Sequence, residues 1–429
     1  MSKQVVIVGG GAGGLELATT LGHKFKNTAS VDVLLIDKSP YHIWKPLFHE
    51  VATGSLDVDM DGVDYRAHAA NHHFEFQLGE LRDLDREGKS IKVNPIQSDN
   101  GEELVPAREV AYDILVLGIG SITNDFSTPG VKEHCLTIDT TRQAESFHKK
   151  ILNEFLKIKA SSENKPLRIN IIGAGATGVE LSAELFKLTD LIKTYGFTKI
   201  SRHSIEVNLI EASGRILQAL PERISDSAEK VLAKLGVNVH INTQVEEVLA
   251  NGVAIKDGAK ISSDINVWCA GVKVSDNFAS LGGLQTNRIN QFDVKPSLQS
   301  VTDDHIFAIG DCASLKQDNG QFVPPRAQSA HQMADTAAVN IANLINDKPL
   351  QSFKYKDKGS LVSFADYTSI GFLSSMAHKQ VFVEGWVARN LYVSLYRLHQ
   401  AALHGYIKML LLMLVGRINR RLRPRMKLH

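Results

Sequence analysis

The sequence has few cysteines, and its C-terminal part has no long uninterrupted hydrophobic run. Its three cysteines, Cys135, Cys269 and Cys312, are too few and too widely spaced for a disulfide framework, a CxxC redox pair or a zinc cluster. The longest apolar run of the C-terminal part, residues 409–415, is far shorter than the roughly 20 residues of a spanning helix. The N-terminus lacks the basic segment and apolar stretch of a signal peptide. We therefore expect a chain that is not exported, stays in a reducing compartment and does not cross a membrane.

The composition is that of a globular protein with a basic tail. Of 429 residues, 43% are hydrophobic and 22% are charged, and this length predicts two or three domains. The formal net charge is +1, but residues 385–429 carry nine Lys and Arg and no Asp or Glu. The rest of the chain is therefore acidic, and we expect the tail to bind an anionic partner.

Two segments, about 160 residues apart, share one pattern. A strand over 5–8 and a strand over 168–172 each run into a glycine-rich turn and a helix. A second apolar strand then ends in an acid, Asp37 or Glu211. Both segments read as a βαβ unit with a GxGxxG turn. The glycines of the two turns are Gly9, Gly11, Gly13 and Gly14, with Ala12 between them, and Gly173, Gly175 and Gly178.

Such a turn lets backbone N–H groups approach a pyrophosphate at the start of a helix, while the acid binds a ribose. A single glycine turn is often purely structural, but two copies with strand context and a following acid favour two dinucleotide sites. Glu211 lies 33 residues after Gly178, further than the usual spacing of about 20. We expect a longer helix and loop over residues 186–204 to account for this.

Several other segments predict strands around these units. Residues 74–81 and 90–93 read as short strands, and residues 112–117 read as a buried one. A further strand over 265–268 runs toward Gly271. Asp311 follows an apolar strand and a glycine, where it could bind a ligand or cap a turn, and the residues alone leave both open.

Beyond the two glycine turns and Asp311, three segments are more specific: residues 40–47 (PYHIWKPL), 327–332 (AQSAHQ) and 396–400 (YRLHQ), with the last seven residues. In these features, and over its whole length, the chain resembles the type II NADH:quinone oxidoreductases, especially their γ-proteobacterial form. The resemblance implies an α/β fold with two Rossmann-like dinucleotide-binding domains and a C-terminal membrane-associated helical segment. It implies an FAD domain over 1–120 and 295–350, an NADH domain over 165–290, and a C-terminal region over 355–429.

The resemblance also implies roles for individual residues near a tightly bound FAD. The pyrophosphate would lie at Gly9, Gly11, Ala12, Gly13 and Gly14, the ribose at Asp37 and Lys38, the adenine at Leu81, the ribityl chain at Asp311, and the isoalloxazine at Ala327 and Gln328. Gln328, Gln332 and Lys379 would border the quinone. On the residues alone, the two glutamines fit a solvated helix face and Lys379 an exposed loop.

For NADH, the resemblance implies a pyrophosphate at Gly173, Gly175 and Gly178, with Gly271 also in the site. Glu211 would bind the ribose and repel the 2′-phosphate of NADPH, although Arg215 leaves this preference open. Glu180 would be the catalytic residue, where nicotinamide, flavin and quinone meet. By itself it reads as an acid that complements the helix dipole.

The implied activity is transfer of two electrons, as hydride, from NADH to FAD and on to a membrane quinone, ubiquinone or menaquinone, without proton pumping. We expect a peripheral protein on the cytoplasmic face of the cell inner membrane, with neither a metal nor a nucleic acid bound. Whether it forms a homodimer is left open.

The tail suits this location. Residues 388–403 predict an amphipathic helix whose apolar arc includes Leu395, Leu398 and a buried His399. Gly405 breaks it, and an apolar segment with arginines then suits the headgroups of an anionic bilayer. The aliphatic neighbours of these arginines favour lipid over nucleic acid.

Other functions of the same architecture would require features that this chain lacks or would not require features that it has. A disulfide reductase or a sulfide:quinone reductase needs a pair of cysteines that the chain does not offer in sequence. A ferredoxin- or rubredoxin-type NADH reductase would not need the basic apolar tail. A flavoprotein that senses NADH without turnover stays open, because two intact glycine turns allow hydride transfer without requiring it.

Overall fold

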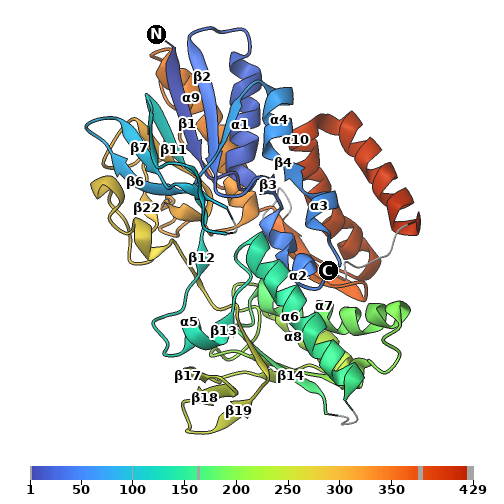
Figure 1. The fold of residues 1–429 in the computed structure, drawn as a ribbon. Coiled ribbons are helices and arrows are strands. Elements are labelled where there is room, and N and C mark those ends of the chain that lie inside the picture. The colour runs from blue at the N-terminus through green and yellow to red at the C-terminus, as the bar shows by residue number, and fades with distance from the viewer. Residues whose placement is uncertain (1, 99, 162–164, 375–379, 423–429) are drawn as a thin grey trace. The chain divides into compact units, whose positions relative to one another are not determined.

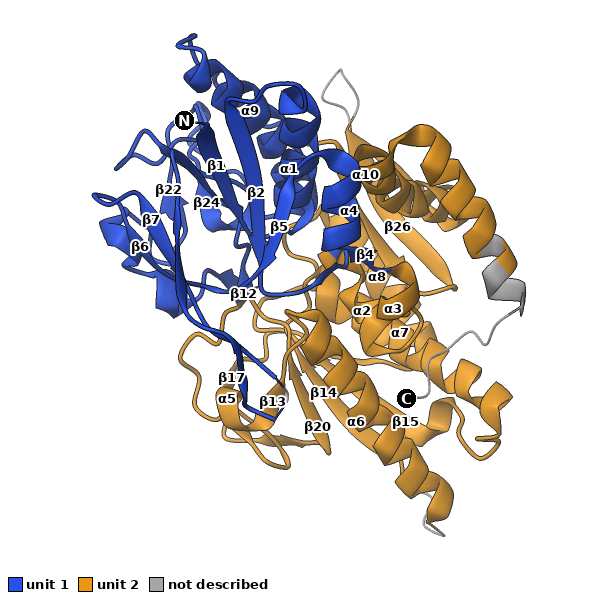
Figure 2. Cartoon of the chain, turned by 45° about the horizontal axis from the view of Figure 1, so that its top comes forward, with its two compact units in different colours: residues 1–44, 62–122, 272–356 blue, residues 45–61, 123–271, 357–429 orange. Residues whose placement is uncertain are grey.

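A computed structural model describes residues 2–98, 100–161, 165–374 and 380–422, and the chain divides into two compact units. Unit 1 comprises residues 1–44, 62–122 and 272–356, and unit 2 comprises residues 45–61, 123–271 and 357–429 (Figure 2). Each unit is therefore assembled from three separate stretches of sequence.

Unit 1 contains a five-stranded parallel sheet in the order β23-β11-β1-β2-β5. Its strands are β1 (Lys3–Val8), β2 (Val31–Asp37), β5 (Glu75–Leu78), β11 (Ile114–Leu117) and β23 (Ile306–Ala308). Figure 1 labels three of these strands, β11, β1 and β2. The last four residues of β1 are all buried, as a parallel strand covered on both faces requires. The helices α1 (Ala12–Phe25) and α9 (Ala327–Ile345) pack against each other beside this sheet.

A smaller antiparallel sheet of unit 1, in the order β10-β7-β6, corrects one prediction. It consists of β6 (Leu81–Asp85), β7 (Ser90–Val93) and β10 (Arg108–Ala111). The strand predicted over 74–81 is too long, because β5 ends at Leu78 and β6 begins at Leu81. Further elements of unit 1 include α4 (Tyr65–His72), β3 (Tyr41–His42), β4 (Val63–Asp64), β8 (Ile96–Gln97), β9 (Glu103–Val105), β22 (Phe292–Asp293) and β24 (Ala313–Ser314).

Unit 2 contains a second five-stranded parallel sheet, in the order β13-β20-β14-β15-β16. Its strands are β13 (Cys135–Leu136), β14 (Leu167–Ile172), β15 (Ile205–Ile210), β16 (Asn238–His240) and β20 (Ile265–Trp268). A small antiparallel sheet consists of β17 (Val245–Leu249), β18 (Gly252–Ile255) and β19 (Lys260–Ser262).

The helices of unit 2 include the one that follows the second glycine turn. They are α2 (Phe48–Ala52), α3 (Val58–Asp61), α5 (Val131–His134), α6 (Thr141–Ala160), α7 (Ala176–Ile192) and α8 (Glu222–Leu235). After α7, two 3₁₀ turns, Lys193–Tyr195 and Arg202–Ser204, lead into β15. The longer helix and loop predicted between Gly178 and Glu211 are thereby confirmed.

The C-terminal part of unit 2 is an antiparallel sheet followed by a broken helix. The sheet consists of β25 (Gly359–Phe364), β26 (Thr368–Ser374) and β27 (Gln380–Glu384). The helix α10 (Gly385–Leu422) packs its first part on this sheet and is interrupted at Gly405, which has φ 77°. The predicted break at Gly405 is confirmed.

The exposure of α10 differs from the predicted pattern in one respect. Ala388, His399 and Leu403 are buried as predicted, but Leu395 and Leu398 are 41% and 57% exposed. The buried side of α10 is therefore narrower than the apolar arc predicted from the sequence.

By length and composition, residues Gly385–Gly416 of α10 could cross a membrane. The break at Gly405 leaves Tyr406–Gly416 as the continuous apolar part, about 17 Å long at 1.5 Å per residue. A bilayer core is about 30 Å thick. Ile407, at 78% exposure, and its apolar neighbours in this part face outward from unit 2, which fits a segment lying on a membrane.

Candidate functional site

In unit 1, the glycine turn after β1 leaves the start of α1 open. Gly9 has φ +102°, a left-handed conformation that side chains disfavour. A Cβ on Gly14 would lie 1.9 Å from the Gly9 carbonyl oxygen, so only glycine lets the helix pack here. A Cβ on Gly11 would meet nothing within 4 Å among the described residues. Because no described side chain caps α1, its first N–H groups remain available for a pyrophosphate.

In unit 2, the turn between β14 and α7 repeats this geometry. Gly173 has φ +101°, and a Cβ on Gly178 would lie 2.0 Å from the Gly173 carbonyl oxygen. Gly175 faces open space within the described part of the chain, and α7 likewise begins without a side-chain cap. Each unit therefore offers, by its own residues, a cradle that fits a dinucleotide pyrophosphate.

The acid at the end of each second strand is tied to its glycine turn in the same way. Asp37 accepts hydrogen bonds from the N–H groups of Gly10 (2.6 Å) and Ser39 (2.7 Å). Glu211 accepts them from Ala174 (2.8 Å) and Ser213 (2.9 Å). Burial raises the pKa of Asp37, although the two N–H bonds oppose this shift. The two acids therefore have the same local geometry, although they follow their glycine turns at different distances along the sequence.

Other predicted FAD residues lie at the ends of the unit 1 strands. Leu81 is buried at the start of β6, and the exposed Lys38 lies 3.8 Å from the carboxylate of Glu80. Asp311 follows β23 and accepts a hydrogen bond of 2.8 Å from the Ser121 hydroxyl.

Two side chains that the sequence did not reveal contact the glycine turn of unit 1. The Tyr65 hydroxyl donates a hydrogen bond of 2.6 Å to the Gly10 carbonyl oxygen, and His42 Nδ1 lies 2.9 Å from the same oxygen. His42 belongs to the quoted segment 40–47. Its role in the turn could not be read from the sequence, because the two segments are distant along the chain.

The residues predicted to lie at the isoalloxazine, Ala327 and Gln328, and at the quinone, Gln328, Gln332 and Lys379, differ in their surroundings. Ala327 begins α9, and Gln328 lies half-buried in its first turn. The Gln332 amide donates to the Lys356 carbonyl oxygen and accepts from the Lys356 N–H, each at 3.0 Å, so it braces the chain after α9. Lys379 lies outside the described residues. The roles of Gln328, Gln332 and Lys379 at the quinone remain predictions.

Two more predicted residues belong to unit 2. Gly271 has φ +64°, and a Cβ there would lie 2.5 Å from the Phe126 ring, which explains the need for glycine. Glu180 lies just past the first turn of α7, two residues after Gly178, and is only 6% exposed.

Glu180 lies in an environment that favours its protonated form. One oxygen accepts a hydrogen bond from the Ser363 N–H (3.0 Å), and the other lies 3.5 Å from His49 Nδ1. Burial raises the pKa of Glu180 to about 8, and the nearby charges of Glu50 and Glu184 act in the same direction. Burial lowers the pKa of His49 to about 3, so its imidazole is neutral at pH 7.

Behind Glu180 lies a group of ionisable side chains that we call the α7 cluster: His49, Glu50, Glu180, Glu184 and Lys187. One side-chain atom of each of His49, Glu50 and Glu184 lies within 4.8 Å of the others. Lys187 Nζ lies 3.3 Å from Glu184 and 3.6 Å from the exposed Asp366. The sequence alone did not predict this cluster, although the spacing of 180, 184 and 187 places three ionisable groups on one helical face.

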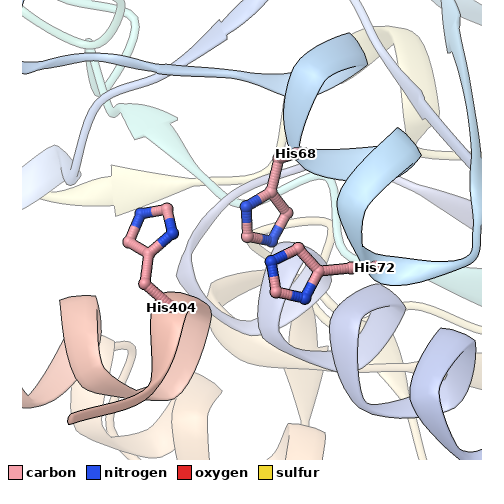
Figure 3. A group of neighbouring side chains, drawn as sticks. All are labelled: His68, His72 and His404. Atoms are coloured by element: carbon pink, nitrogen blue, oxygen red, sulfur yellow. The ribbon is translucent and has the colours of Figure 1, made fainter. Parts of the chain in front are cut away.

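The histidines of α4 form a separate group in unit 1. The rings of His68 and His72, one turn apart, stack with centroids 4.1 Å apart (Figure 3). His68 also lies 2.9 Å from the Thr19 hydroxyl, and His72 lies 2.8 Å from His23. These contacts join α4 to α1, and we assign them a structural role. The third ring in Figure 3, His404, belongs to α10 of unit 2.

The cysteines are poor nucleophiles where they lie. Burial raises the pKa of Cys135 and of Cys312 to about 12, and it raises that of Cys269 as well. All three thiols are therefore protonated at neutral pH and lack the thiolate that disulfide chemistry requires. This agrees with the argument from their spacing.

Comparisons with known proteins show the family to which the chain belongs. Residues 3–334 match the model of the pyridine nucleotide-disulphide oxidoreductases. A type II NADH:quinone oxidoreductase of Haemophilus influenzae is 47% identical over the whole of both chains. Another, from Staphylococcus aureus, is 27% identical and covers 86% of this chain and 90% of its own.

Solved structures show the same fold at low sequence identity. NDH2 of Plasmodium falciparum in complex with NADH has a TM-score of 0.83 at 20% identity, with both chains fully covered. The sulfide:quinone oxidoreductase of Aquifex aeolicus has a TM-score of 0.73 at 19% identity, covering 95% of this chain and 92% of its own.

The fold and its two cradles thus define a pyridine nucleotide-dependent oxidoreductase. Within that class, the chain belongs to the type II NADH:quinone oxidoreductases. The family, the α/β fold class and the oxidoreductase activity predicted from the sequence are confirmed.

Proposed function

We propose that unit 1 holds FAD, that unit 2 holds NADH, and that the chain reduces ubiquinone or menaquinone at the cytoplasmic face of the cell inner membrane. The single observation that carries this proposal is the repeated cradle. Gly11 and Gly175 both leave the start of an uncapped helix open, and an acid braces each turn.

The chain's residues contribute binding and orientation. The turn from Gly9 to Gly14 with Asp37 would hold the pyrophosphate and ribose of FAD, and the turn from Gly173 to Gly178 would hold those of NADH. When bound, FAD supplies the two-electron chemistry, accepting hydride from NADH and reducing the quinone. Lys38, Leu81, Asp311, Ala327 and Gln328 complete the proposed FAD site.

Glu180 is the proposed proton donor to the quinone. It lies directly after the NADH turn, and its raised pKa keeps the carboxyl group protonated near neutral pH. Gln328, Gln332 and Lys379 are proposed neighbours of the quinone, and Gly271 of NADH.

The surroundings of Glu211 support a preference for NADH over NADPH. A carboxylate at this position repels a 2′-phosphate. Arg215, which could have bound that phosphate, is engaged elsewhere. Its guanidinium donates to the Gln218 and Leu220 carbonyl oxygens and to the Ser225 hydroxyl, at 2.8, 2.9 and 2.6 Å.

One experiment tests this function directly. Purified protein is titrated anaerobically with NADH, and a soluble quinone is then added. We expect a yellow protein that is bleached by NADH and regains its colour with quinone. Protein that is colourless after FAD supplementation, or that stays yellow with NADH, would contradict the proposal, and bleaching without reoxidation by any quinone would favour an NADH sensor.

The membrane location has its own test. A chain ending after His404 lacks the exposed apolar part of α10. We expect it to reduce soluble quinone in detergent but to lose binding to anionic vesicles. Retained vesicle binding would contradict the proposed role of this segment.

A further inference from the structure

The α7 cluster connects the buried Glu180 to the surface of unit 2. From Glu180, His49 Nδ1 lies 3.5 Å away, and His49 lies within 4.8 Å of Glu184. Glu184 in turn accepts a hydrogen bond of 3.0 Å from the hydroxyl of the half-buried Ser55. Gaps of this size are closed by a side-chain rotation or by a single bridging water.

We propose that Glu184 takes up protons near Ser55 and passes them through His49 to Glu180, which makes it the proton-entry residue for quinone reduction. This inference rests on the proposed function of Glu180 and adds a route to it. The overall reaction, NADH + H⁺ + quinone → NAD⁺ + quinol, consumes one proton beyond the transferred hydride. A buried donor that gives up that proton in each turnover must be reprotonated from solvent.

The individual groups suit these roles. A neutral imidazole can accept a proton on one ring nitrogen and donate from the other, and His49 is neutral because burial lowers its pKa to about 3. The pKa of Glu184 is raised by burial, so a proton can reside there. Lys187 has a raised pKa and stays charged, which makes it an anchor for Glu184 and not a carrier.

The ionisable groups that face this route come from several elements of unit 2. His49 and Glu50 belong to α2, Lys187 to α7 and Tyr392 to α10, and Asp366 lies in the turn between β25 and β26. Because Lys187 lies between Glu184 and Asp366, protons entering from the side of Asp366 would meet a fixed positive charge. Ser55 is therefore the more favourable entry point.

The proposal is tested with Glu184→Gln, which keeps the size of the side chain but cannot carry a proton. The matched control is Asp190→Asn, which removes an ion-paired carboxylate from the same helix, outside the cluster. Ser55→Ala, at the half-buried entry, is a second variant with little risk to folding.

The first readout needs no turnover. In the flavin-loaded protein without NADH or quinone, infrared spectroscopy follows hydrogen–deuterium exchange of the protonated Glu180 carboxyl, identified by its loss in Glu180→Gln. We expect exchange about tenfold slower in Glu184→Gln, about threefold slower in Ser55→Ala, and unchanged in Asp190→Asn. Wild-type exchange in Glu184→Gln would overturn the route.

The second readout separates the two half-reactions by rapid mixing. In Glu184→Gln, we expect flavin reduction by NADH within twofold of wild type and flavin reoxidation by quinone about tenfold slower at pH 8, recovering toward pH 6. Equal slowing of both half-reactions would indicate a structural role and overturn the route. If Glu180→Gln leaves reoxidation unchanged, the proposed function of Glu180 fails. If only Glu184→Gln leaves it unchanged, the route alone fails.

Discussion

Glu16 of unit 1 and Glu180 of unit 2 occupy the same position in the two copies of the motif, two residues after the last glycine, and both are 6% exposed. Both also lie beside a histidine. The partner of Glu16 is His331, whose side chain is 39% exposed and which is hydrogen-bonded to the carboxylate. The partner of Glu180 is His49, which is 3% exposed.

This difference shows that the motif fixes the position of the acid while its surroundings decide the chemistry. His331 has contact with solvent and is hydrogen-bonded to the Glu16 carboxylate. Burial raises the pKa of Glu180 to about 8, and His49, held neutral by its own burial, offers no positive charge to oppose this rise. One acid is suited to brace two helices, and the other is suited to donate a proton.

The largest expected effect comes from replacing one glycine in the turn of each unit, which tests the two cofactor sites separately. In Gly14→Ala and Gly178→Ala, the new Cβ would lie 1.9 and 2.0 Å from a carbonyl oxygen of the same turn. We expect Gly14→Ala to lose its flavin, and Gly178→Ala to stay yellow but bind NADH more than about 100-fold more weakly. Visible spectra and NADH titrations measure both effects. Loss of flavin from Gly178→Ala would break the assignment of one cofactor to each unit.

The next largest effect concerns the two glutamates. Because a positioned general acid contributes roughly 10²–10⁴ in rate, we expect Glu180→Gln to slow flavin reoxidation by quinone about 100-fold, with flavin reduction by NADH retained. Glu16→Gln should leave both half-reactions near wild type but cost about 1–3 kcal/mol of unfolding free energy. Stopped-flow kinetics and denaturant unfolding provide the measurements. Equal kinetic effects in the two variants would mean that the environments do not differ as described.

The pH dependence of stability sharpens the same contrast. The pKa of Glu180 rises from 4.5 to about 8 on folding, so the folded state holds this proton more tightly. Its contribution to stability is fully present below pH 4.5 and is lost as the pH rises through 8. Glu180→Gln should remove a slope on the order of a few kcal/mol across this window.

Unfolding free energies measured at several pH values test this slope. Asp190→Asn is the control, because the pKa of Asp190 is lowered below its ordinary value of 3.8 and its stability contribution is lost only on further acidification. Parallel curves for wild type and Glu180→Gln between pH 4.5 and 8 would refute the expectation.

The smallest effect concerns the two acids proposed to bind a ribose, Asp37 and Glu211. Glu211→Ser removes the carboxylate that opposes a 2′-phosphate, and we expect the NADH-to-NADPH ratio of kcat/KM to fall about tenfold, with flavin retained. Steady-state kinetics with both nucleotides measures the ratio. An unchanged ratio would shift the origin of the preference away from Glu211.

The two cradles could be predicted from the sequence, whereas the α7 cluster could not. A GxGxxG turn is local, since its strand, glycines and helix start lie within a dozen residues, and the acid follows on the neighbouring strand. The surroundings of Glu180 come instead from His49, Ser363 and Tyr392, which only the tertiary fold brings together.

The two predictions that need correction, on α10 and on residues 74–81, likewise concern features that a local sequence pattern does not specify. Apolar periodicity correctly predicted the amphipathic helix, but Leu395 and Leu398 are exposed because periodicity does not specify which part of an arc meets the body of the protein. The strand predicted over 74–81 was too long because a turn of two residues, Gly79 and Glu80, is too short to interrupt an apolar pattern.

The most direct test of this account is an infrared pH titration of the carboxyl groups in the flavin-loaded protein, with Glu180→Gln as the reference. We expect a carboxyl band, absent from that variant, that loses its proton near pH 8. A Glu180 band that titrates near pH 4.5 would contradict the claim that the fold turns one of two equivalent glutamates into a proton donor.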